Sequence, residues 1–386
     1  MWNFHVGRIM GIPIRINVTL LLFLPVIAWL IASGQQIEIY ADLIAGISPH
    51  TLDVEVLMAG DTPWIIGLTG AIGLFGSVLI HELGHSWMAR RYDIGISSIT
   101  LWIFGGMAHM EDLPEDWNIE FWIALAGPVT SVLLGVLFYG LLLVLPGGSV
   151  VVFVVGFLAI INVILAVFNM LPAFPMDGGR ILRALLASNQ PYARATQTAA
   201  TVGKGFAILM GFVGIFGNPL LILIALFIYV AASAESRATV MRDLLKGVTA
   251  GDLMRESPST MADSTVQELV NRIMLDRHTA YPVVDADDSV VGLVTLSNVK
   301  TVSESDRSSR RVADVMRTDP ETASPEDEAF DVLVAFGGRD EPLIVTDDDG
   351  RLLGVITQGD IARAMEVIQG LRESPDPRRV VPEGYA

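Results

Sequence analysis

Residues 81–85 read HELGH, and they lie inside an apolar run from Trp64 to Met88. A run of this length and composition is long enough to cross a lipid bilayer as a helix. On such a helix His81 and His85 share one face, where two imidazoles can take two corners of a tetrahedral Zn²⁺ site. Glu82 is the next residue round the helix and can accept a proton from an attacking water. The stretch therefore predicts a metal site within a membrane-spanning helix.

A chance match inside a buried structural helix is the alternative to a functional site. The chain has six histidines in 386 residues, and two of them stand four residues apart with a glutamate between them. Their neighbours are mostly apolar residues and glycine. An ionisable side chain in such surroundings is costly unless it has a partner or a function. The surroundings therefore favour a functional site over chance.

A third metal ligand is needed, and catalytic zinc sites usually take it from a distant part of the chain. The chain contains no cysteine, so the site has to use histidine and carboxylate. Asp177 is the best candidate, within the stretch NMLPAFPMDGGR of residues 169–180. The prolines of this stretch stop the preceding helix, which predicts that Asp177 lies on a turn that can reach the metal. An aspartate-glycine turn at a helix end, without any metal, is the alternative.

The two motifs together resemble the site-2 protease family of intramembrane zinc metalloproteases. The resemblance rests on HELGH in one apolar segment and N-x-x-P-x-x-P-x-D-G-G at the end of a later one, and it covers roughly residues 1–240. It implies one Zn²⁺ per chain, held by His81, His85 and Asp177, with Glu82 as the catalytic base. Asn169 is then a candidate donor to the substrate carbonyl or its oxyanion, or else a structural polar group of its helix.

The composition predicts that much of the chain is embedded in a membrane. Hydrophobic residues make up 52% of the sequence and charged residues only 17%, whereas soluble proteins carry about 25% charged residues. The apolar runs lie at residues 14–34, 63–90, 119–145, 150–170, 199–216 and 220–234. The predicted fold class is a polytopic α-helical membrane protein with about six transmembrane helices, followed by a soluble α+β domain.

Residues 94–112 alternate apolar and polar side chains around a Gly-Gly pair, which predicts a short membrane-associated β segment. In the family that the chain resembles, such an edge strand is thought to pair with an extended substrate, and we expect this edge near Ile99 to Phe104. His109 is a candidate extra ligand in this segment, although three ligands complete the site without it.

The charges predict an orientation in the membrane. Residues 35–62 hold five acidic and no basic residues, and arginines follow the second, fourth and sixth apolar runs. The positive-inside rule then puts both termini and the soluble region in the cytoplasm. The chain has 22 Arg and three Lys at a net charge of −17. This balance favours a prokaryotic, halophilic source, with high genomic GC content as the alternative explanation.

The region from residue 247 onward is acidic and internally repeated. It carries 27 acidic and 14 basic residues, so nucleic acid is excluded as its partner. Residues 251–300 and 313–364 match at an offset of 62, and each reads helix, strand, turn, strand, helix. The repeat resembles a tandem pair of CBS domains. The expected division is a protease domain at 1–246, CBS domains at 247–372 (about 247–304 and 311–370), and a disordered tail at 373–386.

The resemblance to CBS pairs implies a site for an adenine nucleotide (AMP, ADP or ATP). In that family the hydroxyl of a G-x-x-T-x-x-D pattern contacts phosphate, and the acid binds ribose. By position these residues are Thr295, Thr357 and Asp360, while Asn298 replaces the acid in the first repeat. The alternative is a purely structural module, through which the chain forms a homodimer.

Together these features predict a zinc-dependent intramembrane endoprotease. Its substrate would be a transmembrane segment of another protein within the lipid bilayer, and nucleotide binding to the CBS pair would regulate it. A CBS-regulated membrane transporter and a non-catalytic nucleotide sensor are the alternatives. The metal-binding motifs discriminate between them, because a transporter has no need of HExxH combined with a distant Asp-Gly-Gly.

Overall fold

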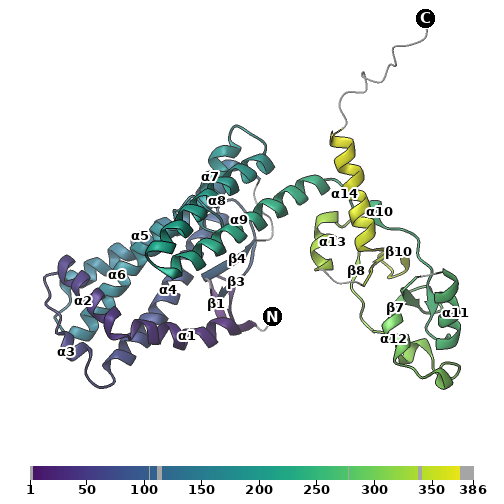
Figure 1. The fold of residues 1–386 in the computed structure, drawn as a ribbon, viewed down its shortest axis with the longest axis horizontal. Coiled ribbons are helices and arrows are strands. Elements are labelled where there is room, and N and C mark those ends of the chain that lie inside the picture. The colour runs from purple at the N-terminus through teal and green to yellow at the C-terminus, as the bar shows by residue number, and fades with distance from the viewer. Residues whose placement is uncertain (1–2, 104, 111–114, 277, 338–340, 374–386) are drawn as a thin grey trace, which may run out of the picture. The chain divides into compact units, whose positions relative to one another are not determined.

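The computed structural model describes residues 3–103, 105–110, 115–276, 278–337 and 341–373, and the chain forms two compact units (Figure 1). The first unit comprises Met1–Arg237 and the second Ala238–Ala386. Each unit is described by itself below. Of the predicted disordered tail, only Glu373, at the end of helix α14, belongs to the described residues.

The first unit combines long helices with one four-stranded sheet. Its helices are α1 (Val18–Ile31), α2 (Gly34–Ile47), α3 (Val54–Leu57), α4 (Thr62–Arg90), α5 (Trp117–Val144), α6 (Ser149–Asn169), α7 (Asp177–Ala187), α8 (Tyr192–Phe216) and α9 (Pro219–Leu245). Its strands are β1 (Asn3–Ile9), β2 (Ile12–Asn17), β3 (Ile96–Trp102) and β4 (Gly105–Met110).

Five of these helices are long and apolar enough to cross a membrane, namely α4, α5, α6, α8 and α9. The pair α1 and α2 passes the same test together but is bent by 66° at its break, so up to six spans are present among the described residues. This agrees with the predicted count of about six. Apolar side chains such as Leu133, Val136 and Phe216 are 64%, 62% and 78% exposed, as expected for helix faces that contact lipid.

The chain start differs from the sequence prediction. Residues 14–17 belong to strand β2 and not to the first spanning helix, which begins at Val18. Ile12 and Ile14 are buried while Arg15 is exposed, the period-two alternation of a strand. The side chain of Asn17 accepts a hydrogen bond from the Thr19 amide and so caps the helix that follows.

The predicted β segment is a hairpin of β3 and β4, but its edge is not where we expected it. The strand order is β1-β2-β3-β4, with β3 paired parallel to β2 and antiparallel to β4. Ile99 to Trp102 therefore lie on an interior strand, and the expectation of an edge there is wrong. The edge strand is β4, because β2 from the start of the chain covers the other side of β3.

The helices that surround the sheet bring the two sequence motifs together. Helix α4 packs against α1, α5 and α6, and α5 also packs against α7. Helix α7 begins directly at Asp177, so this residue opens a helix and does not lie on a free turn as predicted. The turns of 170–176 separate α7 from the end of α6.

The second unit consists of two similar halves. The first half contains α10 (Ala250–Leu253), β5 (Thr260–Met261), α11 (Val266–Asp276), β6 (Ala280–Val284), β7 (Val290–Thr295) and α12 (Leu296–Lys300). The second half contains β8 (Thr322–Ala323), α13 (Ala329–Phe336), β9 (Leu343–Thr346), β10 (Leu352–Ile356) and α14 (Gln358–Glu373). Each half has a three-stranded mixed sheet. From α11 and from α13 onward the order is the predicted helix, strand, turn, strand, helix, and the short strands β5 and β8 before them were not predicted.

The two halves are joined by a pair of equivalent backbone bridges. Arg255 pairs with Val355, and Leu293 pairs with Arg317. Each bridge maps onto the other under the offset of 62 residues found in the sequence. The halves are therefore related by a pseudo-twofold arrangement, as a tandem repeat that packs against itself requires. The predicted fold class, a helical membrane region followed by an α+β repeat, is confirmed.

Candidate metal centre

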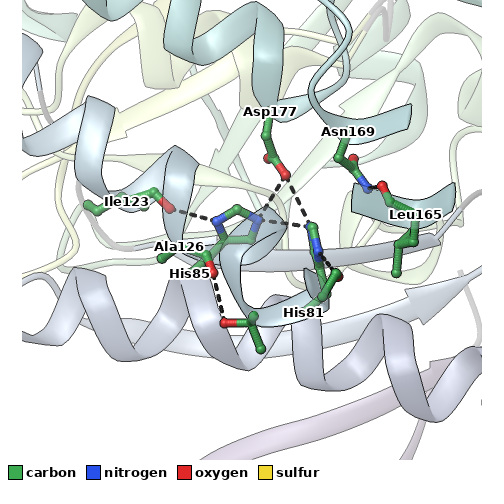
Figure 2. Close-up of polar contacts among 9 residues, drawn as sticks. His81, His85, Ile123, Ala126, Leu165, Asn169 and Asp177 are labelled. Atoms are coloured by element: carbon green, nitrogen blue, oxygen red, sulfur yellow. Dashed lines mark hydrogen bonds and ion pairs between the residues drawn. The ribbon is translucent and has the colours of Figure 1, made fainter. Parts of the chain in front are cut away.

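The candidate ligands come from the middle of α4 and from the first residue of α7. His81 and His85 are one turn apart on α4, and both are 4% exposed. Asp177 is 7% exposed and points toward both imidazoles (Figure 2). These three residues form a group of buried side chains that can hold a metal ion. Asp177 is 96 residues from His81 in the sequence. Helix α5 packs against both α4 and α7 and so brings the two residues into contact.

The three ligand atoms form a nearly regular triangle. His81 Nε2 lies 3.1 Å from Asp177 Oδ2, His85 Nε2 lies 3.2 Å from the same oxygen, and the two Nε2 atoms are 3.2 Å apart. In a tetrahedral zinc site with bonds of about 2.0–2.1 Å, neighbouring ligand atoms are about 3.3 Å apart. The triangle therefore matches three corners of such a site.

The outer nitrogens of both imidazoles are held by neighbouring groups. His85 Nδ1 lies 2.7 Å from the carbonyl oxygen of Ile123, and His81 Nδ1 lies 2.8 Å from Ser131 Oγ. A carbonyl oxygen only accepts, so His85 Nδ1 carries a proton, and in the neutral imidazole Nε2 keeps its lone pair. In that form lone pairs of imidazole and carboxylate converge on one position, an arrangement suited to a metal cation. The donor set, two imidazoles and one carboxylate, is one that Zn²⁺ takes at catalytic sites.

Ser131 is the residue whose role was hardest to foresee. It follows the Ala-Gly-Pro of residues 126–128 in α5, and Thr130 beside it carries a second hydroxyl. The structure distinguishes the two. Thr130 Oγ1 donates to the Ala126 carbonyl within α5, while Ser131 is 1% exposed and contacts His81.

Gly127 lies directly against the candidate ligands, and sequence reasoning gave it no role. A Cβ atom on Gly127 would come within 2.2 Å of His85 Nε2 and 2.7 Å of His81 Nε2. Glycine is therefore required where α5 crosses the imidazoles of α4. The signal that could have found it is the Gly-Pro pair inside an otherwise aliphatic span.

A cavity of about 510 Å³ adjoins the three ligands. Glu82 and Asn169 line it together with apolar side chains of α4, α6 and α9 and with residues of strand β4. Glu82 packs against the backbone of Gly106, where an added Cβ would come within 2.3 Å of Glu82 Cγ. Strand β4 therefore holds the carboxylate of Glu82 at the wall of the cavity, beside the metal-binding triangle.

Asn169 is the last residue of α6, and its side chain donates to the backbone of its own helix. The Nδ2 atom lies 2.9 Å from the Leu165 carbonyl oxygen (Figure 2). Its place on the cavity wall leaves it within the same chamber as Glu82. His109, the candidate extra ligand, is exposed on β4 and is not part of the three-residue metal group.

The residues predicted for a nucleotide site in the second unit all take part in helix capping. Thr295 N and Oγ1 donate to Asn298 Oδ1 at 2.9 and 2.7 Å, and Thr357 N and Oγ1 donate to Asp360 Oδ2 at 2.9 and 2.5 Å. Arg255 Nε lies 3.2 Å from the same oxygen of Asp360. Thr357 and Asp360 therefore form one helix cap in the second repeat, and Thr295 and Asn298 form the equivalent cap in the first repeat.

Burial alone would raise the pKa of Asp360, but the hydrogen bonds from Thr357 and the charges of Arg255 and Arg363 outweigh it and leave the pKa below its usual value. Asp360 is therefore ionised at neutral pH.

Buried imidazole and carboxylate side chains beside a glutamate, within a bundle of membrane-length helices, are the features of a metallopeptidase centre in a membrane-type fold. Comparison with known proteins gives the family. The family model described as Peptidase family M50 matches residues 69–151 and 148–212, and the CBS domain model matches residues 250–304 and 312–367. Both matches agree with the two resemblances found in the sequence.

Two relatives match over almost their whole length. The zinc metalloprotease MJ0392 of Methanocaldococcus jannaschii is 31% identical over 97% of this chain and 99% of its own. The putative zinc metalloprotease Rip3 of Mycobacterium tuberculosis is 32% identical over 96% of this chain and 94% of its own. Among solved structures, a site-2 protease from M. jannaschii is 34% identical, with a TM-score of 0.42 over 61% of this chain and 96% of that one.

The chain therefore belongs to the site-2 protease family, peptidase family M50, and carries a tandem pair of CBS domains. The prediction of a metalloprotease is confirmed by this membership.

Proposed function

We propose that this chain is a zinc endopeptidase that cleaves a transmembrane segment of another protein inside the bilayer. The observation that carries the proposal is the triangle of His81, His85 and Asp177 ligand atoms, 3.1–3.2 Å on each side, buried among membrane-length helices. A Zn²⁺ held by these residues, one per chain, would polarise the scissile carbonyl and make the attacking water more acidic.

Glu82 supplies the proton transfers. Its carboxylate accepts the proton of the attacking water, and the resulting acid then gives that proton to the nitrogen of the departing amine. Its position on the cavity wall supports this role, because both the water and the leaving group have to reach the same chamber. Asn169, which lines that chamber, donates from its amide to the substrate carbonyl once a substrate replaces its bond to Leu165.

The substrate enters in extended form along strand β4. A helical peptide bond is shielded, so the segment has to unwind before it can be cut. Gly105, Gly106, Met107, Ala108 and Met110 of β4 line the cavity, and β4 is one of the two edge strands of the sheet, β1 being the other. An extended segment can add to this edge by main-chain hydrogen bonds, with apolar side chains of the cavity on its other side.

The test compares wild type with Glu82→Gln for zinc content and for cleavage of a model transmembrane substrate. Wild type should hold about one zinc per chain and cleave, while Glu82→Gln keeps the zinc and loses activity by a factor of about 10²–10⁴. Asp177→Asn is the matched variant that should lose the zinc itself. Equal cleavage by Glu82→Gln and wild type would remove Glu82 from the mechanism.

The orientation proposed for the chain places both termini and the CBS pair in the cytoplasm. The arginines at the ends of α4 and α9 support it through the positive-inside rule. Because the chain has no cysteine, single substitutions at exposed Glu55 and Glu304 give clean labelling sites. A membrane-impermeant thiol reagent added to intact cells should label Glu55→Cys and spare Glu304→Cys; the reverse pattern would overturn the topology.

We further propose that the CBS pair binds an adenine nucleotide and that binding regulates cleavage. The adjacent Thr357 hydroxyl and Asp360 carboxylate, with Arg255 at the latter, support a site for phosphate and ribose at the second repeat. AMP, ADP and ATP should each be tested for a rise in the melting temperature and a change in cleavage rate. If none of the three changes either quantity, the pair serves only as a structural module.

A further inference from the structure

Arg183 lies on α7, 4% exposed, at the meeting point of three helices. Its Nε and Nη2 atoms donate to Glu120 Oε1 of α5 at 2.8 and 2.5 Å. Its Nη1 atom donates to Glu235 Oε1 of α9 at 2.6 Å. The guanidinium carbon also lies 5.0 Å from the centre of the Phe174 ring and 4.9 Å from that of Tyr192.

This set of contacts fixes the guanidinium in place and in direction. A planar guanidinium bonded to two carboxylates and stacked on two rings has one orientation that satisfies all four contacts. Glu120 is itself 5% exposed, so the pair is shielded from water and from salt. Buried charge pairs are expensive to desolvate, and an apolar cluster of the same volume would hold the helices together as well. The cluster therefore points to a requirement for exact placement and not only for stability.

The element that Arg183 holds in place is the one that carries Asp177. Helix α7 is only 11 residues long, and Asp177 is its first residue. Phe174, on which Arg183 stacks, lies three residues before Asp177 in the preceding turns. Those turns rest closely on α7, because a Cβ at Gly178 would come within 2.4 Å of the Met170 carbonyl oxygen. A shift of Arg183 would thus move both the turns before Asp177 and helix α7 after it.

Metal binding is sensitive to such a shift. Ligand distances are held within about 0.2 Å of their ideal values in metal sites, and residues behind the ligands change affinity by factors of about 10–100 when they are replaced. On the basis of the proposed function, we infer that Arg183 is a positioning residue for the metal centre. It sets Asp177 Oδ2 against the two imidazoles, with Glu120 as its buried anchor, and its bond to Glu235 makes this placement depend on α9.

Because Arg183 also bonds to α9, a movement of α9 can change the position of Asp177. Glu235 is less buried than Glu120, with 40% of its side chain exposed, so its bond is the more easily broken of the two. Helix α9 continues beyond Glu235 to Leu245, which is buried in the hydrophobic core of the second unit. The Glu235 bond is therefore one route by which a displacement of α9 reaches α7, beside the packing of Ile228 in the same buried cluster as Met176.

The experiment measures metal binding by the full chain in detergent, without any substrate. Zinc affinity is measured by competition with a chelator, and the Co²⁺-substituted protein reports ligand geometry through its visible d–d absorption. Arg183→Lys, which keeps the charge but loses the planar fork, should bind zinc about tenfold more weakly and shift the Co²⁺ spectrum. Glu235→Gln should lose about two- to fivefold, since a half-exposed ion pair contributes less.

Lys204→Met is the matched control. Lys204 of α8 lies 6.0 Å from the Tyr229 ring of α9, so its replacement removes a contact of α9 that does not involve Arg183. It should leave zinc affinity and the Co²⁺ spectrum at wild-type values. Melting temperatures are recorded for all variants, which separates general destabilisation from a change in the metal centre.

The outcomes distinguish this inference from the proposed function. If wild type binds neither zinc nor Co²⁺, the proposed metal centre itself is wrong. If wild type binds both and Arg183→Lys and Glu235→Gln match it in affinity and spectrum, Arg183 is only a structural residue. Should Arg183→Lys fail to fold, Glu235→Gln decides, because the Glu235 side chain is 40% exposed and its replacement leaves the bond between Arg183 and Glu120 in place.

Discussion

Two aspartates, one in each unit, are almost equally buried and have opposite surroundings. The side chain of Asp177 is 9% exposed and that of Asp360 is 8% exposed. Asp360 faces donors, namely the amide and hydroxyl of Thr357 and the guanidinium groups of Arg255 and Arg363. Asp177 faces two imidazole nitrogens, and the one on His85 is an acceptor whenever that imidazole is neutral, because its other nitrogen donates to the Ile123 carbonyl.

The difference shows how the neighbours of a buried carboxylate bear on cation binding. A carboxylate surrounded by donors is satisfied by the protein. A carboxylate that shares its site with the lone pairs of neutral imidazoles is suited to hold a metal cation. The comparison supports a metal in the first unit, while the buried acid of the second unit is satisfied by protein donors.

The largest expected effect comes from filling the space beside the imidazoles. Gly127→Ala should reduce zinc affinity and cleavage by at least about 100-fold, because the new methyl group overlaps His85 Nε2. Zinc content and cleavage rate measure this directly. Gly140→Ala, at an open position of the same helix, is the control and should behave as wild type. Normal zinc binding by Gly127→Ala would mean that the ligands lie elsewhere.

Removal of the metal should lower the stability of the first unit and leave that of the second unit unchanged. A ligand present at 100 times its Kd stabilises the folded state by about 2.7 kcal/mol, so chelation should lower the melting temperature of the first unit. The second unit, whose buried acid is satisfied by the protein, should keep its transition. Hydrogen exchange followed peptide by peptide, with and without chelator, reports each unit. Equal loss of protection in both units would contradict the prediction that the metal stabilises only the first unit.

A smaller effect is expected from the group behind His81. Ser131→Ala removes the hydroxyl 2.8 Å from His81 Nδ1 and should weaken zinc binding by about tenfold. The neighbouring Thr130 bonds only within its helix, so Thr130→Val is the control. Chelator competition gives both affinities. A larger loss in Thr130→Val than in Ser131→Ala would show that helix packing, and not the bond to His81, is what matters.

The smallest effect is expected at Asp360, since the first repeat already carries the alternative residue. Asp360→Asn reproduces the cap made by Thr295 and Asn298, so it should change the free energy of unfolding of the second unit by less than about 1 kcal/mol. Any nucleotide affinity that depends on the acid should nevertheless be lost. A titration with AMP, ADP and ATP beside urea unfolding measures the two separately.

The pH dependence of unfolding gives a further measure of the same residue. The folded pKa of Asp360 is lowered, so its stabilisation is present above the unfolded value of about 3.9 and is lost as pH falls through the folded value. Wild type should therefore lose more stability than Asp360→Asn between neutral and acid pH. Parallel pH curves for the two proteins would contradict the lowered pKa.

The sequence by itself determined the features that depend on local spacing and composition. Two histidines four residues apart share a helix face whatever else the chain does, and apolar runs of membrane length form spanning helices because lipid leaves no other way to satisfy the backbone. The tandem repeat is equally visible, since it is a self-match along the chain. The distant Asp177 was found only because its motif resembles that of a known family.

The tertiary structure decided everything that depends on which segments become neighbours. The strand at 12–17, the edge position of β4, the closeness of Gly127 to the imidazoles and the cluster around Arg183 all involve partners far away in sequence. Only the proline that follows it marks Gly127 among the glycines of the spans, and nothing local distinguishes Arg183 from an arginine at a membrane surface. Their roles arise from helix crossings and strand pairings, which are set by packing over the whole unit.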